Sequence, residues 1–430
     1  MNSFLFADTV LFISLAISLG TYVLVGKREG TYLNILTPSF LIGIPAFYLL
    51  PLFFTHFVGN DASPYAYIYV YATIAAENVA FTYAYLRPTR KVIRLPFRYS
   101  YHNFDKLSLV SLALGFLMYL PILLEFPEYI LSPRQIYANT RTGFGVNFYI
   151  SSTLAYLAVI FIQFSAHSWR RKWSVILAAA FLLSLHGSKG QVISLFFLLA
   201  LYEVYVHRIK ARFLPSLIVV GAMSFLMLAL FAFTMVLDQD PVEALQAISE
   251  YSDYTRNGML VIDSHFPLQY GRLTLEGHIF GRIPRVLMPS KPKNFGALYL
   301  DEQFFPGSLD RDNGAPDFGM GVQYADFGVL AIVYLAFFAA VRGWLARVFI
   351  LRLRTTRHPA DFLMVAFFAN VTIFPVGAVG WLLPETLLTA ILFRYASCIG
   401  AKKIYHEHIG YKRPAPPNPG LAPINGLEGI

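Results

Sequence analysis

A lysine flanked by two glycines interrupts an apolar stretch of the chain. The segment HGSKGQ runs from His186 to Gln191, and Gly187 and Gly190 allow the backbone to turn tightly and to approach a ligand closely. A lysine at or near membrane depth is costly unless it is paired or lines a wet cavity. The pattern therefore indicates that Lys189 is presented to an anion. The alternative is an ordinary tight turn with Lys189 in water.

A second segment combines basic residues with prolines. GRIPRVLMPSKP occupies residues 281–292, where Arg282, Arg285 and Lys291 alternate with prolines that stiffen the backbone. Rigidly held guanidinium groups suit bidentate contacts with phosphate oxygens. The segment is a candidate phosphate-binding loop, although the pattern taken alone favours a solvated basic loop paired with nearby carboxylates.

A third segment, SLDRDNGAPDFGMGVQYADFG at residues 308–328, supplies carboxylates directly before an apolar run. Asp310, Asp312 and Asp317 belong to it, and a carboxylate near a reacting hydroxyl can act as a general base. The alternative for each one is a turn-forming aspartate without a chemical role.

Two more arginines, Arg134 and Arg141, are candidates for the same anionic site, or are surface residues. The sequence contains no phosphate-binding P-loop, no HExxH, no paired CxxC and no dinucleotide fingerprint. The histidines show no metal-ligand spacing. We therefore expect no metal and no cofactor.

The elements that position these residues are membrane helices. Of the 430 residues, 56% are hydrophobic and only 14% are charged, against about 25% charged in a typical globular domain. The single cysteine, Cys398, excludes an intramolecular disulfide framework. These properties predict an all-α polytopic integral membrane protein with about eleven transmembrane helices. The predicted spans are residues 4–25, 32–57, 65–86, 107–124, 148–166, 174–187, 191–206, 213–236, 326–350, 361–379 and 381–399.

Every second loop between these spans is rich in lysine and arginine, which predicts that these loops are cytoplasmic. The N-terminus is then periplasmic and the C-terminus cytoplasmic. Residues 1–236 hold eight helices, residues 237–325 form a large extracytoplasmic loop domain, residues 326–400 hold three more helices, and residues 401–430 form a disordered tail. The HGSKGQ turn and both further candidate segments fall on the extracytoplasmic side, as does the smaller loop at 125–147.

The order of four motifs resembles the Wzy-type oligosaccharide repeat unit polymerases of O-antigen and exopolysaccharide assembly. The motifs are SPRQIYANTRTGFG at 132–145, the GSKG turn at 187–190, IPRVLMPSKP at 283–292 and QYADFG at 323–328. Many members carry arginine at the position of Lys189. The related O-antigen ligases tend to carry a histidine near the position of Asp317, which argues against a ligase.

The resemblance implies an enzyme of the bacterial inner membrane that polymerises undecaprenyl-pyrophosphate-linked oligosaccharide repeat units by glycosyl transfer at the outer face. It implies that Lys189, Arg282, Arg285, Lys291, Arg134 and Arg141 bind pyrophosphate or substrate, and that Arg285 with Asp317 or Asp312 is catalytic. The partners are the lipid-linked oligosaccharide, the bilayer and a chain-length-regulator protein, with no nucleic acid. The alternatives are a ligase-like glycan transferase, or a flippase or transporter of lipid-linked oligosaccharides that does no chemistry.

Overall fold

Helices make up nearly all of the chain's regular structure. The computed structural model describes residues 3–57, 59, 62–87, 97–101, 103–129, 136, 144–187, 189–212, 215, 218, 222, 254–281, 283, 288–307, 316–371, 384–399 and 401–405. The helices that overlap predicted spans are α1 (Ser3–Glu29), α2 (Thr37–Ile44), the π-helical turn η1 (Pro45–Leu49), α3 (Leu50–Phe57), α4 (Pro64–Leu86), α5 (Phe104–Glu125), α7 (Gly145–Phe164), α8 (Trp169–Leu185), α9 (Lys189–Tyr205), α17 (Ala331–Thr356), α18 (Pro359–Phe368) and α19 (Pro384–Ile399). The other elements are β1 (Phe97–Tyr101), η2 (Pro127–Tyr129), α12 (Tyr254–Asp263), α13 (Arg272–Phe280), α14 (Ala297–Phe304), α16 (Gly321–Phe327), η3 (Gly328–Leu330) and β2 (Ala401–Tyr405).

Several of these helices are long and apolar enough to cross a bilayer, so the chain is a polytopic membrane protein in outline. Within the described ranges there are five, namely Leu5–Glu29, Thr37–His56, Phe104–Glu125, Gly145–Phe164 and Gly321–Thr356. The total of eleven stays a prediction, because the span at 213–236 lies largely outside the described residues. α18 is much shorter than the predicted span 361–379: it ends at Phe368, and Asn370 has a φ of 57°.

The expectation of a purely helical fold needs one correction. β1 and β2 form an antiparallel two-stranded sheet in which Phe97 pairs with Tyr405 and Tyr101 with Ala401. The sequence FRYSY alternates aromatic and polar residues, which suits a strand, but a search for apolar spans ignores so short a pattern. The first residues of the tail predicted to be disordered, 401–405, are therefore ordered by pairing with a distant loop.

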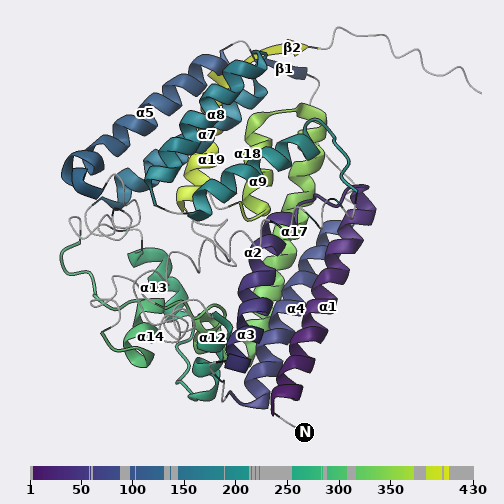
Figure 1. Cartoon of the computed structure of the whole chain (residues 1–430), viewed down its shortest axis with the longest axis vertical. Helices are drawn as coiled ribbons and strands as arrows, with labels where there is room; N and C mark the ends of the chain where they lie inside the picture. Colours follow the sequence, from purple (N-terminus) through teal and green to yellow (C-terminus); the bar gives the residue numbers. More distant parts are fainter. Residues whose placement is uncertain are drawn as a thin grey trace, which may run out of the picture.

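The helices that overlap the predicted spans form two bundles (Figure 1). In one, α4 packs against both α1 and α17, with α2 and α3 beside them. In the other, α7 packs against α5 and α8, with α9, α18 and α19 completing the group. α17 also contacts α18 and α9. The long helix α17 therefore joins the two bundles.

α4 and α17 approach each other unusually closely at Gly343. A Cβ atom added there would lie 2.2 Å from the carbonyl oxygen of Phe81. The adjacent Arg342 places its guanidinium 4.9 Å from the centre of the Phe81 ring and donates from Nη1 to Oδ1 of Asn370 at 3.0 Å. Glu77 of α4 attracts the same guanidinium electrostatically. Glycine is therefore required at position 343, because the Cβ atom of any other residue would overlap the backbone of Phe81.

The C-terminal ends of four helices meet around Glu29, the last residue of α1. Its carboxylate accepts hydrogen bonds from the hydroxyls of Tyr85, at the end of α4, and Tyr205, at the end of α9, the latter at 2.8 Å. Arg347 and Arg354 of α17 interact with it electrostatically. These are helices that the charge pattern predicts to end on one side of the membrane, and the structure brings their ends together.

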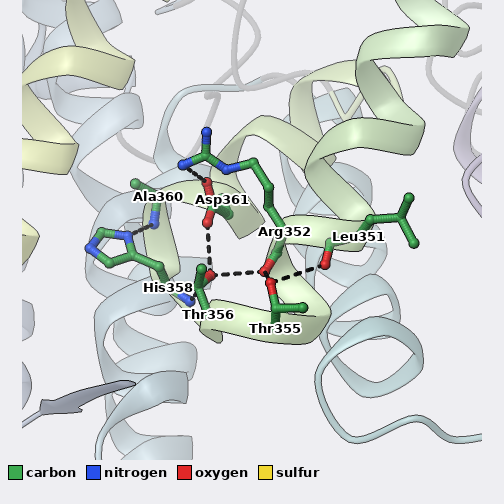
Figure 2. A network of polar contacts seen from close by, with 7 residues as sticks. All are labelled: Leu351, Arg352, Thr355, Thr356, His358, Ala360 and Asp361. Carbon is green, nitrogen blue, oxygen red and sulfur yellow. Dashed lines mark hydrogen bonds and ion pairs between the residues drawn. The ribbon is translucent and has the colours of Figure 1, made fainter. Parts of the chain in front are cut away.

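A compact polar corner reverses the chain between α17 and α18 (Figure 2). Nη2 of Arg352 lies 3.2 Å from Oδ1 of Asp361, and the hydroxyl of Thr356 donates to the other oxygen of Asp361 at 2.8 Å. Nδ1 of His358 accepts a hydrogen bond from the backbone N–H of Ala360 at 3.1 Å, which caps the first turn of α18. The side chains that stop one helix thus start the next.

The described part of the long predicted loop folds into a small helical domain, which we call the loop domain: residues 254–281, 288–307 and 316–327. Its core consists of Val261, Leu273, Leu300, Phe318 and Ala325. Ser63, the N-cap of α4, donates to Asp263 from both its backbone nitrogen, at 2.7 Å, and its hydroxyl, at 2.5 Å. The loop domain is thereby fixed to the N-terminal end of α4, away from β1 and β2 (Figure 1).

The crossing of α4 and α17 gives a first prediction. We expect Gly343→Ala to lower the stability of the protein by about 1–3 kcal/mol, because the added methyl group overlaps backbone rather than a mobile side chain. Gly20→Ala in α1 is the matched control, since nothing lies within 4 Å of the added atom, and a helical alanine is favoured over glycine by about 1 kcal/mol. Thermal unfolding in detergent compares the two variants. Equal melting temperatures would contradict the close approach.

A second prediction concerns acid stability. Burial, and then the charges of Arg394 and Arg352, lower the pKa of His358 from 6.5 to about 4. The unfolded chain therefore takes up a proton at this position before the folded protein does, so stability is lost as the pH falls from 6.5 towards 4. We expect protonation at this position to lower the free energy of unfolding by about 2 kcal/mol between pH 7 and pH 5. His358→Asn keeps a capping side chain that does not titrate, and unfolding in detergent at both pH values should show a correspondingly smaller loss.

Candidate functional site

The turn that precedes Lys189 is anchored by a fully buried histidine. Nδ1 of His186 lies 2.8 Å from the carbonyl oxygen of Leu182, so that nitrogen carries the hydrogen and donates it. Nε2 then accepts from the hydroxyl of Ser151, 3.1 Å away. The rings of Tyr119 and Phe148 lie 4.5 Å from the imidazole, centre to centre. Helices α5 and α7 thus hold the end of α8 in place.

Lys189 is the first residue of α9, directly after this turn. Gly187 has a φ of 65°, a conformation that suits glycine, and it reverses the chain between α8 and α9. The hydroxyl of Tyr156 in α7 donates to the carbonyl oxygen of Gln191 at 2.6 Å and fixes the first turn of α9. The backbone of Lys189 is therefore held firmly, while its side chain lies outside the described atoms.

Lys291 closes the proline-rich basic segment on itself. Its Nζ atom donates to the carbonyl oxygen of Ile283 at 3.1 Å and lies 4.7 Å from the centre of the Phe295 ring. The two ends of the IPRVLMPSK sequence are thereby tied together. Arg282 and Arg285 are the two arginines of this segment that were predicted to bind phosphate. Both lie outside the described residues.

Asp317 is an exposed carboxylate at the approach to α16. Its Oδ1 atom accepts from the backbone N–H of Gly319 at 2.8 Å, and its carbonyl oxygen accepts from the side chain of Asn257 at 3.1 Å. The first contact forms a local turn, and the second fixes the segment to α12. The other candidate base, Asp312, is outside the described residues, as are Arg134 and Arg141. Between those arginines, Ile136 is fully buried in the core of the α5–α7 bundle.

Asp326 was not among the predicted site residues, and its carboxylate holds two parts of the loop domain together. Its carboxylate accepts hydrogen bonds from the backbone nitrogens of Leu273 and Thr274, at 2.9 and 2.7 Å, and from the hydroxyl of Thr274 at 2.6 Å. The backbone N–H of Gln269 donates to the carbonyl oxygen of Ala325 at 2.9 Å. The QYADFG motif therefore caps the N-terminus of α13. The aspartate of the motif is visible in the sequence. Its capping role is not, because the residues to which it bonds lie about fifty positions earlier in the chain.

The predicted site residues are thus divided between two parts of the fold. Asp317 and Lys291 belong to the loop domain, and Lys189 belongs to the bundle of α5, α7, α8 and α9. Among the described residues no three histidine, cysteine, aspartate or glutamate side chains are grouped closely enough to hold a metal ion. Among the described side chains of the predicted site, the exposed carboxylate of Asp317 can accept a proton.

Comparison with known proteins gives two relatives that span almost the whole chain. They are the O-antigen polymerase of Salmonella typhimurium (strain LT2) and the O-antigen polymerase of Salmonella typhi. Each is 35% identical over 397 residues, which cover 91% of this chain and 94% of the relative. No protein-family model and no solved structure matches the chain.

The role of Asp326 gives a third prediction. Asp326→Ala should leave two backbone N–H groups of α13 without their acceptor, at a cost of about 1–3 kcal/mol, and should loosen α13 from α16. Limited proteolysis of the purified protein in detergent should then cleave the loop domain faster. Thr274→Val is the matched control, because it removes one hydroxyl contact and keeps both backbone bonds. Wild-type resistance of Asp326→Ala would refute the capping role.

Proposed function

Because this chain belongs to the O-antigen polymerase family, we propose that it joins oligosaccharide repeat units into polysaccharide in the inner membrane of a bacterium. The observation that carries the proposal is 35% sequence identity over 91% of the chain. A multi-pass membrane protein is suited to this reaction, since each repeat unit is attached to a lipid.

The proposed donor is a growing glycan on undecaprenyl pyrophosphate. A hydroxyl of the next lipid-linked repeat unit attacks the anomeric carbon of the donor, the carbon–oxygen bond to the pyrophosphate breaks, and the hydroxyl proton passes to a base. Pyrophosphate departs with additional negative charge, so cationic side chains that stabilise that charge accelerate the reaction. Neither a metal nor a nucleotide is required in this scheme, because basic residues take the part of a divalent ion.

We assign the anion-binding role to Lys189, Arg282 and Arg285, with Arg134 and Arg141 as further contacts to the substrate. For Lys189, support comes from the fixed backbone at the start of α9. For the two arginines of the proline-rich segment, it comes from the hydrogen bond between Lys291 and Ile283, which restrains these two described residues of the same segment. Lys291 itself acts through that restraint, since its ammonium group is already bound to the backbone.

We assign the general base to Asp317, with Asp312 as the second choice. The carboxylate of Asp317 is exposed, and only its Oδ1 atom is engaged in the local turn. The other oxygen is therefore accessible to an incoming hydroxyl. The neighbouring Asp326 is unsuitable for this role, since it is 1% exposed and its carboxylate accepts three hydrogen bonds.

The reaction is proposed for the outer face of the membrane, with the N-terminus periplasmic and the C-terminus cytoplasmic. Support comes from the helix ends gathered around Glu29, which are followed in the chain by basic loops, and from the loop domain at the opposite end of α4. A chain-length-regulator protein is the proposed partner, on the strength of the family alone.

Size-resolved glycan profiling of a strain deleted for this protein, against its complemented parent, tests the proposal. Persistence of single repeat units with loss of long chains is the expected outcome. Long chains that form but remain on the carrier lipid would indicate a ligase. Repeat units confined to the inner face would indicate a flippase, and the proposed outer site would then be wrong.

Complementation of the same strain with variants gives a fourth prediction. Arg285→Ala should abolish long chains at an unchanged protein level, because it removes a cation that contacts the leaving group. Lys189→Arg should retain polymer, since the positive charge is kept, whereas Lys189→Ala should not. Lys293→Ala, an exposed basic residue outside the proposed set, is the matched control and should polymerise normally. Equal activity of Lys189→Arg and Lys189→Ala would show that the turn has only a structural role.

A further inference from the structure

The large exposed apolar side chains of the loop domain are confined, within the described residues, to one stretch of the chain. They lie in α12, in α13 and in the turn between them: Leu260, Leu268, Tyr270, Leu275 and Ile279. None occurs in the described residues 288–307, where the exposed side chains include Lys293, Glu302 and Gln303. We call the stretch from Leu260 to Ile279 the apolar side of the loop domain and residues 288–307 its polar side.

The apolar side has the pattern of a helix at an interface. Leu275 and Ile279 are 59% and 46% exposed and lie one turn apart on one face of α13, while Leu273 points into the core of the loop domain at 1% exposure. In the turn before α13, Tyr270 is 85% exposed. A short helix with one face in a protein core and leucine, isoleucine and tyrosine on its outer face needs a second apolar surface or a lipid surface to cover them.

The position of α13 relative to the membrane favours lipid. α13 is attached through Asp326 and Ala325 to α16, and α16 forms the start of the apolar segment Gly321–Thr356, which is long enough to cross a bilayer. Val329, Leu330 and Val333, only a few residues further on, are 58%, 66% and 62% exposed. α13 is thus attached to a membrane-crossing segment only a few residues before the exposed apolar side chains of that segment.

We propose that α13 and the turn before it are an interfacial anchor, in which Leu268, Tyr270, Leu275 and Ile279 enter the boundary between headgroups and acyl chains on the side of the membrane that carries the loop domain. Tyrosine is favoured at that depth, because its ring sits among acyl chains and its hydroxyl among headgroups. Arg272, whose guanidinium lies 4.9 Å from the centre of the Tyr299 ring of α14, turns towards the polar side.

This anchor has a consequence that rests on the proposed function. α13 ends at Phe280, and the basic proline-rich segment begins with the next residue, Gly281. A helix fixed at headgroup level therefore starts that segment at headgroup level, which is also the level of the pyrophosphate of a lipid-linked substrate. The anchor would let the loop meet its substrate without lifting the lipid out of the bilayer.

Site-directed spin labelling tests the anchor directly. Cys398 is exposed and is the single cysteine, so Cys398→Ser provides a background for Leu275→Cys, Ile279→Cys and, as the matched control in α14, Glu302→Cys. The full chain is reconstituted in vesicles of phosphatidylethanolamine and phosphatidylglycerol. We expect labels at 275 and 279 to collide several-fold more with oxygen than with a water-soluble nickel chelate, and the label at 302 to show the reverse preference.

Two results would overturn the anchor. Labels at 275 and 279 that are as accessible to the nickel chelate as the label at 302 would place α13 in water. Labels that are immobilised and shielded from both reagents would show that protein, such as a second copy of the chain, covers this face. The measurement needs no turnover, so lipid-exposed labels together with long chains that persist in the deletion strain would refute the proposed function and leave the anchor standing.

Discussion

Arg342 makes one of the contacts that hold the two helix bundles together. Its guanidinium comes from α17, is attracted by Glu77 and stacks near Phe81 of α4, and donates to Asn370 just after α18. A charge within an apolar bundle is costly unless partners surround it, and every one of these partners comes from a different turn or helix. Because the cost of losing any one contact is high, the arginine fixes the relative position of the helices that supply them.

The two ends of the helix bundles are built differently. At one end, helix termini are gathered by the carboxylate of Glu29 and by the polar corner of Arg352 and Asp361. At the other, Ser63 and Asp263 attach the loop domain to α4. The first end is closed by short-range bonds among helix termini, whereas the second carries a folded unit with exposed ionisable side chains. This asymmetry supports the proposal that the reaction takes place at one face of the membrane.

Much of the helical framework could be predicted, because apolar length and loop charge are local properties of a sequence. Contacts between distant segments could not. The QYADFG motif was visible, but nothing near it reveals that Asp326 caps α13. Substrate binding by Lys291 stays a prediction, and its charge and the neighbouring prolines did not reveal that its ammonium group donates to the carbonyl oxygen of Ile283. The shortness of α18 depends on a backbone reversal at Asn370, which no glycine or proline marks at that residue.

The pairing of β1 with β2 sets an order of events during synthesis. Phe97 and Tyr405 are partners, so β1 emerges roughly 300 residues before the strand that completes it, an interval of about 15 to 60 s at common translation rates of about 5–20 residues per second. For that time β1 is an unpaired edge, open to association with other chains. β2 therefore closes the sheet long after β1 is made, and a ribosome that stops before residue 405 leaves a nascent chain with this edge still exposed.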